Sequence, residues 1–237
     1  MAVVAIFGPT AVGKTAVAIE LAALYRERGE DPVAVSCDAI QVYRGLEVTS
    51  GAADAAERAA LEHRLIAVAE VSEEFSAGRF AELEADVAAR IHPNDRKRVA
   101  RALELQRAGL DPPDRESGLW TAQLRHPTAL IGIVCDREEL AARIDRRVDA
   151  MIAAGAGAEA RAAAAAGASR TARSALGFDE LIAGDADAVK AAHRRYARRQ
   201  MTWLRRMEGV TVIDRSGLDD REAARLVLAG ADSAGTG

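Results

Sequence analysis

The chain of 237 residues has little of several residue types, and each shortage excludes a class of protein. Its two cysteines, Cys37 and Cys135, lie far apart, so neither a disulfide framework nor a cysteine metal site is expected. We expect both thiols to be reduced. The apolar N-terminal run ends at Gly8, too short to span a membrane, and it lacks the basic leader of an export signal. These features predict a cytoplasmic protein without a membrane segment.

Aromatic residues are also scarce, at 4%, and the formal net charge of −4 shows no overall excess of positive charge. Any binding of nucleic acid must therefore depend on a local basic cluster. The hydrophobic content of 49% is that of an ordinary globular protein, and this length suits one domain or one domain with an insertion. We expect that domain to cover residues 1–228, followed by a disordered tail of small and polar residues at 229–237.

A phosphate-binding motif, GPTAVGKT, begins seven residues into the chain, between an apolar run and a helical pattern at residues 15–28. The spacing of Gly8, Gly13, Lys14 and Thr15 is that of a P-loop, and a strand before and a helix after it are the context the motif requires. Its backbone N–H groups would hold a phosphate or diphosphate, Lys14 would add a positive charge, and the Thr15 hydroxyl would ligate Mg²⁺. The predicted binding residues are Gly8, Pro9, Thr10, Ala11, Val12, Gly13, Lys14 and Thr15. The motif alone does not distinguish a kinase, an ATPase and an enzyme of another diphosphate.

The rest of the chain alternates between strand and helix patterns. After the first strand, strands are expected at residues 32–37, 65–71, 128–135 and 210–214. Helices are expected at residues 76–91, 95–107, 137–154, 171–183 and 186–206. This alternation predicts an α/β fold with a mainly parallel sheet flanked by helices, and ligands at the carboxyl ends of its strands.

Asp38 directly follows the second predicted strand, in the sequence SCDAIQVYRG, and should lie near the phosphate loop. A carboxylate in this place can bind Mg²⁺ through water or act as a general base. It can equally cap a turn or a helix. Gln41 and Tyr43 on the same loop could contact a base, or Tyr43 could pack in the core.

The local basic cluster lies at residues 190–207, which contain six arginines and one lysine but no acid, together with Tyr196 and Trp203. Such a helix favours a phosphate-rich partner. The alternatives are a solvated helix face, or arginines paired with acids such as Asp179 and Glu180. A weaker basic patch lies at residues 96–101.

Taken in order, these stretches resemble the tRNA dimethylallyltransferase (isopentenyltransferase) family. The resemblance rests on GPTAVGKT, SCDAIQVYRGLEV, EHRLIAV, FSAGRF, IHPNDRKRVARALEL, IGIVCDREELAARIDRRVDAMIAAG, TARSALGFDEL and RYARRQMTWLRR. It implies a P-loop NTPase-like fold and transfer of a dimethylallyl group from its diphosphate to N6 of an adenine beside the anticodon. Mg²⁺ is the implied cofactor, the anticodon arm of tRNA and dimethylallyl diphosphate are the implied partners, and we expect a monomer.

The resemblance also implies roles for single residues. Asp38 would be the base, and Lys14 and Thr15 would serve catalysis at the diphosphate. Contacts to tRNA would come from Asp38, Ala39, Ile40, Gln41, Lys97, Arg98, Arg101, Arg173, Arg198 and Arg199.

Two departures from the family pattern stand out. Members carry a strand and loop reading roughly Gly-Gly-Thr-Gly-Leu-Tyr and then a helical insertion, whereas this chain is shortened near residues 80–92. Loss of a strand beside the phosphate-loop strand would expose apolar surface. Either this is a minimal form, or an internal segment of the natural polypeptide is absent from this sequence. The second departure is at residues 46–59, where a family lysine is missing.

Three other functions are compatible with parts of the pattern. A small-molecule P-loop kinase would use ATP and no tRNA. A related enzyme would prenylate a free adenine nucleotide, although the arginine helix favours a polymer. A remnant without activity would bind RNA alone.

Overall fold

The structure, a computed structural model, describes residues 3–75 and 127–234. The helices expected at residues 76–91 and 95–107 lie outside the described residues. So do Lys97, Arg98 and Arg101, and the shortened insertion near residues 80–92. Among the described helices, none combines the length and the apolar character needed to cross a bilayer.

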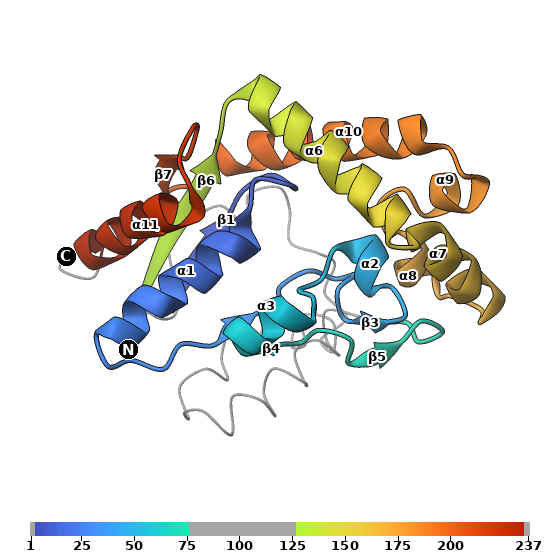
Figure 1. The fold of residues 1–237 in the computed structure, drawn as a ribbon, viewed down its shortest axis with the longest axis horizontal. Helices are drawn as coiled ribbons and strands as arrows, with labels where there is room; N and C mark the ends of the chain where they lie inside the picture. The colour runs from blue at the N-terminus through green and yellow to red at the C-terminus, as the bar shows by residue number, and fades with distance from the viewer. Residues whose placement is uncertain (1–2, 76–126, 235–237) are drawn as a thin grey trace, which may run out of the picture.

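A three-stranded parallel sheet forms the centre of the fold (Figure 1). Its strands are β1 (Val3–Phe7), β6 (Thr128–Val134) and β7 (Thr211–Asp214), in the order β1-β6-β7. Ile131 of β6 pairs with Ile6 on one side and with Thr211 on the other. The expected parallel sheet and these three strands are confirmed.

Strand β1 is an edge of this sheet as far as the described residues show. Five consecutive residues of β6 are buried, whereas β1 is only partly buried and Val3 is 40% exposed. An apolar strand is therefore partly exposed at this edge.

Two of the expected strands, at residues 32–37 and 65–71, are wrong in extent and do not join the central sheet. Residues 32–37 contribute β2 (Ala34–Val35), which pairs with β4 (His63–Arg64). Residues 65–71 contribute β5 (Ala69–Glu70), which pairs with β3 (Tyr43–Arg44). Leu65 and Ala67 have φ angles of 61° and 53°. Left-handed backbone cannot continue a strand, so the apolar run breaks there.

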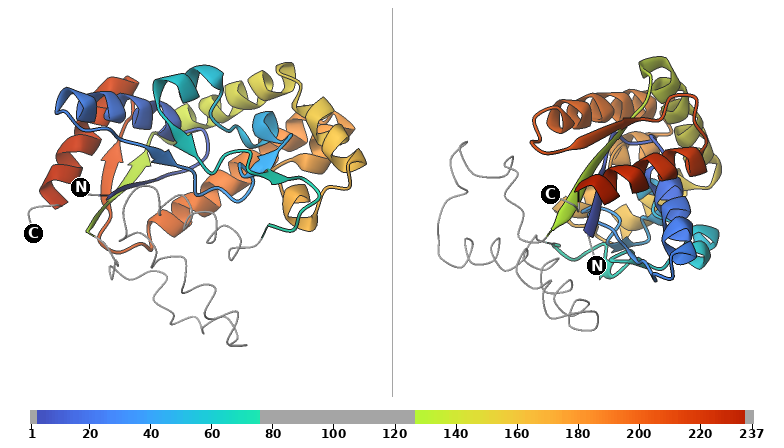
Figure 2. Two further views of the ribbon diagram at one scale, coloured as in Figure 1. Left: turned by 90° about the horizontal axis from the view of Figure 1, so that it is seen from below. Right: turned by 90° about the vertical axis from the view of Figure 1, so that its left-hand side faces the viewer.

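Helices α1 (Lys14–Glu27) and α11 (Asp220–Ala234) lie side by side against the sheet (Figures 1 and 2). The disordered tail predicted at residues 229–237 is therefore wrong for residues 229–234. Helix α11 continues through them, and it buries Val227 and Ala231. On the other face of β6, Leu204 lies over Gly132, where a Cβ atom would meet it at 2.7 Å.

Most of the remaining helices pack around a second hydrophobic core beside the sheet, whereas α3 lies against α1. The long helices α6 (Arg137–Ala153) and α10 (Ala186–Leu204) begin at Asp136 and Asp185, whose carboxylates accept hydrogen bonds from first-turn N–H groups. Such capping satisfies donors that a helix leaves unpaired. The helix expected at residues 171–183 is two short helices. The shorter helices are α2 (Glu47–Ser50), α3 (Ala55–Ala60), α7 (Ala156–Ala165), α8 (Arg170–Arg173) and α9 (Phe178–Ala183).

The phosphate loop lies where two hydrophobic cores meet. One core joins the sheet to α1 and α11 and includes Val12. The other joins α6, α7, α9 and α10 to the β3 and β5 region, and Ala11 packs against it. Leu140 of α6 contacts both cores. Consecutive residues of the loop are thus anchored in different parts of the fold.

Candidate diphosphate site and basic helix

The backbone of the phosphate loop explains its glycines. Gly8 and Gly13 have φ angles of 152° and 94°. A Cβ atom on Gly8 would lie 2.5 Å from the carbonyl oxygen of Ile133, and one on Gly13 would lie 2.3 Å from Nη1 of Arg215. Glycine is therefore required at both positions for conformation and for space.

The loop presents several backbone donors without acceptors. The Thr10 N–H donates to the side chain of Gln200 at 2.7 Å, and the Val12 N–H points to the carbonyl of Pro9 at 3.3 Å. Within the described residues, the N–H groups of Ala11, Gly13, Lys14 and Thr15 have no hydrogen-bond acceptor. Helix α1 begins at this point without a side-chain cap. Converging donors at an uncapped helix N-terminus form a site for an anion.

Lys14 is folded back onto this loop. Its Nζ donates to the carbonyl oxygens of Gly8 and Pro9, each at 3.0 Å. Burial and, as the second cause, the positive charge of Arg147 lower the pKa of the Lys14 ammonium from 10.5 to about 8, although Asp38 opposes them. A bound anion would reverse this effect, because a nearby negative charge favours the charged lysine.

Three arginines that we did not predict as site residues surround the loop. Arg147 of α6 donates to the carbonyls of Ser50 and Gly51, both at 3.4 Å, and burial lowers its pKa although Asp38 and Glu57 oppose that shift. The sequence carried no signal that Arg147 lies near the loop, since α6 is far from the loop in the chain.

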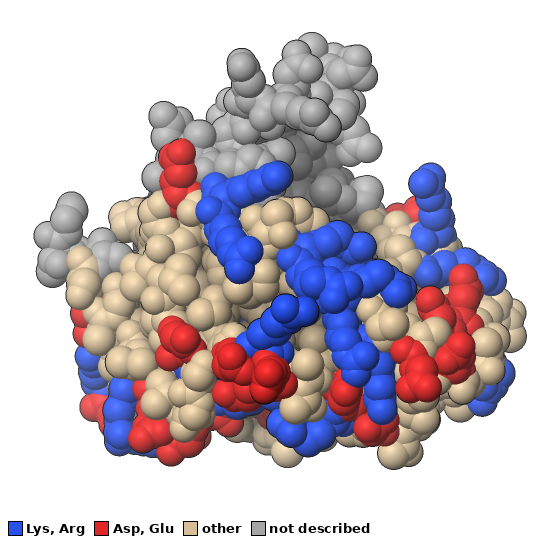
Figure 3. All heavy atoms as spheres, turned by 90° about the horizontal axis from the view of Figure 1, so that it is seen from above, with Lys and Arg blue, Asp and Glu red and all other residues tan. Residues whose placement is uncertain are grey.

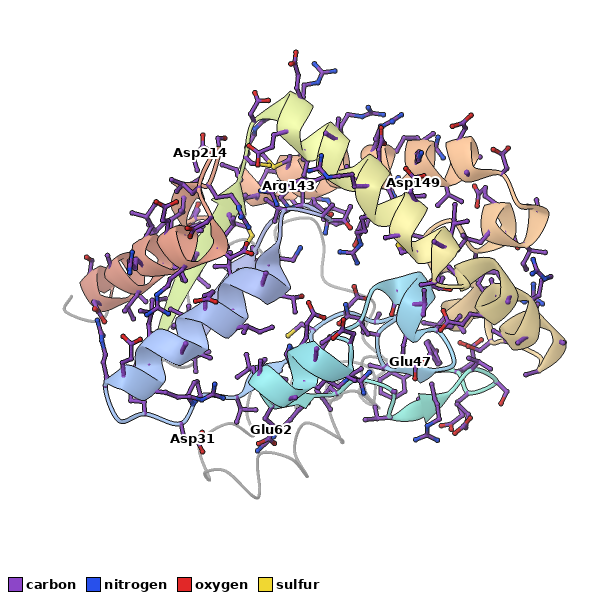
Figure 4. All side chains as sticks on the ribbon, in the orientation of Figure 1. Asp31, Glu47, Glu62, Arg143, Asp149 and Asp214 are labelled. Carbon is purple, nitrogen blue, oxygen red and sulfur yellow. The ribbon has the colours of Figure 1, made fainter. Side chains whose placement is uncertain are left out.

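The other two arginines lie close to Gly13. Arg143 pairs with Glu139 of the same helix at 2.8 Å, and Figure 4 shows it beside the turn between β1 and α1. Arg215 follows β7 and is 1% exposed. It donates to the carbonyl of Val12 at 3.1 Å and pairs with Asp220 at 2.8 Å. Lys14 and three arginines therefore lie at or near the loop, although Arg143 and Arg215 are each paired with an acid.

Asp38 makes the capping contact that we considered from the sequence, and it lies near the phosphate loop, as expected. Its Oδ1 accepts a hydrogen bond from the Ile40 N–H at 2.8 Å, which is a turn-capping role. It is also close enough to Lys14, Arg147 and Tyr196 for its charge to shift their pKa values. The residue is exposed.

The rest of this loop forms a frame around Asp38. Ala39 is exposed, and Ile40 packs at the edge of the helical core. Gln41 accepts a hydrogen bond from the Ser36 hydroxyl at 2.7 Å and donates to the carbonyl of Gly51 at 3.4 Å. Tyr43 is fully buried, so its packing alternative is correct.

Helix α10 carries most of the basic cluster, and two of its cations have acidic partners. Lys190 pairs with Asp149 at 2.7 Å, and Arg194 pairs with Asp145. Both acids belong to α6, not to the Asp179 and Glu180 segment that we considered. The arginines at positions 195, 198, 199, 205 and 206 are exposed and have no ion pair within the described residues.

Arg195, Arg198 and Arg199 recur at helical spacings of three and four, so they share one side of α10. Figure 3 shows lysine and arginine side chains gathered in the middle of the surface over α6 and α10. Tyr196 and Trp203 meet edge to face with ring centroids 6.3 Å apart, and the Arg199 guanidinium lies 5.5 Å from the Tyr196 ring. Trp203 is 41% exposed. Exposed aromatic rings among arginines suit contact with nucleic-acid bases and phosphates.

Arg173 is not part of this cluster. Its guanidinium lies 5.7 Å from the Phe178 ring, and its Nε donates to the carbonyl of Ala168 at 3.2 Å. Helix α8, which carries it, lies at the far end of α6 from the sheet (Figures 1 and 2). An extended ligand would be needed to touch Arg173 and the phosphate loop together.

The sequence of this chain matches known protein families. A family model described as isopentenyl transferase matches residues 1–85, and a second, described as IPP transferase, matches residues 81–207. The chain is 35% identical to a tRNA dimethylallyltransferase of Anaeromyxobacter dehalogenans, over 90% of this chain and 95% of the relative. The chain belongs to the tRNA isopentenyltransferase family. The expected family and its prenyltransferase class are therefore confirmed.

Other relatives and solved structures agree. A tRNA dimethylallyltransferase of Streptococcus pneumoniae is 30% identical over 94% of this chain and 97% of its own length. The tRNA isopentenylpyrophosphate transferase of Bacillus halodurans is 25% identical, with a TM-score of 0.71 over 99% of this chain and 98% of that one. The Staphylococcus epidermidis structure, at 23% identity and a TM-score of 0.73 over 98% of this chain and 99% of that one, shows the shared fold. The P-loop NTPase-like fold is thus confirmed.

The alignments also bear on the shortened segment of this family member. The alignment with the A. dehalogenans relative has 288 positions, 51 more than the 237 residues of this chain. At least 51 positions within the relative therefore have no counterpart here. The two family models meet at residues 81–85, beside the place where the sequence predicts the missing strand and insertion.

Proposed function

We propose that this chain transfers the dimethylallyl group of dimethylallyl diphosphate to N6 of an adenine next to the anticodon of a tRNA. The observation that carries the proposal is the contact between Thr10 of a diphosphate-type loop and Gln200 of α10, the helix that also carries exposed arginines and two aromatic rings. Membership of the isopentenyltransferase family supports it. The proposed reaction takes place in the cytoplasm, between one protein chain and one tRNA.

The proposed chemistry assigns a task to each group. The N6 lone pair forms a bond to the allylic carbon, and the carbon–oxygen bond breaks with its electron pair going to the diphosphate. Lys14 and the N–H groups of the loop hold that growing negative charge, which is the type of contact that stabilises a transition state most. Asp38 accepts the proton that N6 releases. The diphosphate then leaves intact.

A Mg²⁺ ion fits the residues that are present. Magnesium usually keeps several waters and binds through substrate phosphates and one or two protein oxygens. Thr15 offers one hydroxyl in the first turn of α1, next to the free N–H groups. The part of the chain that the structure describes has no group of three or more acids, histidines and cysteines that could cage a metal. When bound, the ion would neutralise charge on the diphosphate.

The proposed tRNA contacts start from Asp38, Ala39, Ile40 and Gln41 beside the loop and continue over Arg198 and Arg199. The exposure of Asp38, Arg198 and Arg199 supports these contacts. Arg173 would touch a more distant part of the same RNA. Lys97, Arg98 and Arg101 remain predicted contacts.

Labelled dimethylallyl diphosphate tests the function directly, with tRNA or AMP as the acceptor in separate reactions. Label should pass to tRNA and not to AMP, and labelled ATP should yield no phosphoryl transfer. Transfer to AMP would identify a nucleotide prenyltransferase, and phosphoryl transfer a kinase. Binding of tRNA with no transfer to either acceptor would identify an inactive RNA-binding protein.

Asp38→Asn tests the proposed base. The variant should bind diphosphate normally and lose about 100-fold or more in rate, because an amide cannot accept the proton from N6. Asp31→Asn, at an exposed position, is the matched control. If diphosphate affinity fell while the rate at saturation held, Asp38 would contribute to binding and not to proton transfer.

A further inference from the structure

One hydrogen bond links the helix of exposed arginines to the phosphate loop. The Thr10 N–H donates to Oε1 of Gln200 at 2.7 Å, across 190 positions of sequence. Within the described residues no other hydrogen bond joins α10 to residues 8–15. Gln200 lies one turn after Tyr196 on a partly buried part of α10.

The donor in this bond shares a peptide group with an acceptor for Lys14. The Thr10 N–H and the Pro9 carbonyl belong to one planar unit, and in a trans peptide they point in opposite directions. The Pro9 carbonyl accepts a hydrogen bond from Lys14 Nζ at 3.0 Å. Any rotation of this peptide that freed the Thr10 N–H would also turn the Pro9 carbonyl away from Lys14.

The Thr10 N–H is not one of the donors left for an anion. It already donates to Gln200, while the N–H groups of Ala11, Gly13, Lys14 and Thr15 are the ones without acceptors in the described structure. Its bond to Gln200 therefore leaves the anion site open. A neutral acceptor suits this place, because a carboxylate would repel a diphosphate.

We propose that Gln200 is a positioning residue that fixes the Pro9–Thr10 peptide, and with it Lys14, for diphosphate binding. The inference deepens the proposed function, since it rests on the loop being the diphosphate site. The same hydrogen bond connects the loop to the helix that carries the exposed arginines.

The test compares Gln200→Met, which keeps the length and shape of the side chain but lacks the acceptor, with Thr202→Val. The Thr202 hydroxyl donates to the Arg198 carbonyl of its own helix and is exposed, so this control removes a polar group of α10 without touching the loop. Inorganic diphosphate is titrated into each protein by calorimetry. Amide hydrogen exchange at Thr10 is followed by NMR, and melting temperatures are recorded.

We expect Gln200→Met to bind diphosphate about three- to tenfold more weakly, the range that corresponds to one neutral hydrogen bond. Thr10 should lose its protection from exchange while β1 and α1 keep theirs, and the control should match the natural protein. Unchanged affinity with an unprotected Thr10 would overturn the inference, as would an equal loss of affinity in Thr202→Val.

Gln200→Glu keeps the result interpretable if the methionine variant melts much lower. It retains an acceptor, so it should restore the melting temperature and the protection of Thr10, yet bind diphosphate weakly because of its charge. Failure to restore protection would overturn the inference. Suppose that diphosphate binding depends on Gln200 but the protein transfers no prenyl group. The proposed function would then be refuted, and this inference would stand.

Discussion

Replacing Lys14 by methionine should change how stability depends on pH, in a direction set by the surroundings of its ammonium group. Burial and Arg147 hold the pKa of Lys14 at about 8 in the folded protein, although Asp38 opposes them, whereas an ordinary lysine has a pKa of 10.5. Between these two pH values the unfolded chain binds a proton that the folded chain does not. The free energy of unfolding of the natural protein should therefore rise with pH across this window.

The size of the effect follows from the shift. A difference from 10.5 to about 8 corresponds to about 3 kcal/mol, because one pKa unit is about 1.4 kcal/mol. This destabilisation is fully present below pH 8 and disappears above pH 10.5. From pH 7 to pH 9.5, linkage gives a gain of about 2 kcal/mol in the free energy of unfolding. Lys14→Met lacks the titrating group, so it should lack this gain.

The assay is urea unfolding of both proteins at several pH values between 7 and 9.5. Other groups that titrate in this range cancel in the difference between natural protein and variant. Lys190→Met is the control, because hydrogen bonding to Asp149 raises the pKa of Lys190 and so predicts no such gain. Saturating diphosphate should abolish the pH dependence in the natural protein, since the anion keeps Lys14 charged.

Parallel pH profiles for the natural protein and Lys14→Met would refute this reasoning. That result would mean that Lys14 keeps an ordinary pKa and is well solvated. If the free energy of unfolding still rose with pH in saturating diphosphate, the titrating group would not be in contact with the bound anion. Loss of diphosphate binding in Lys14→Met is expected in either case, because the charge that faces the anion is gone.

Two further predictions concern the surroundings of this site. Replacing Arg198, Arg199 and Arg205 together by glutamine should lower the slope of log tRNA affinity against log salt by roughly 0.7–0.9 for each phosphate that an arginine no longer neutralises. Arg194→Gln, which removes only the pair with Asp145, should keep the slope; a triple variant that melts much lower with an unchanged slope would show a structural role instead. Arg147→Met should raise the pKa of Lys14 and so move the onset of its pH-dependent stability above about pH 8, and an unchanged onset would contradict the coupling.

The sequence by itself determined the local parts of this protein. The P-loop spacing predicted the strand, turn and helix of residues 3–27, because contiguous backbone conformation sets that geometry and glycine is required at Gly8 and Gly13. Hydrophobic pattern and length predicted β6, β7, α6 and α10 to within a few residues. The family motifs indicated the family, and the gap between them indicated the place of the missing segment.

Pattern failed where the backbone or a distant neighbour decided the outcome. Leu65 and Ala67 interrupt an apolar run with left-handed backbone, which neither residue type signals. Residues 229–234 look like a tail in composition, yet Ala231 is buried where α11 lies against α1 and the sheet. Alanine is small enough for a close helix contact but carries no sign of that contact in its sequence.

Only the tertiary structure decided which groups surround the anion site. Helical periodicity indicates which arginines share a face, but not that Asp145 and Asp149 of α6 neutralise two cations of the basic cluster. Arg147 and Gln200 reach the loop from distant parts of the chain. Electrostatic and hydrogen-bond partners are set by distance in space, and the packing of α6 and α10 beside the loop fixes those distances.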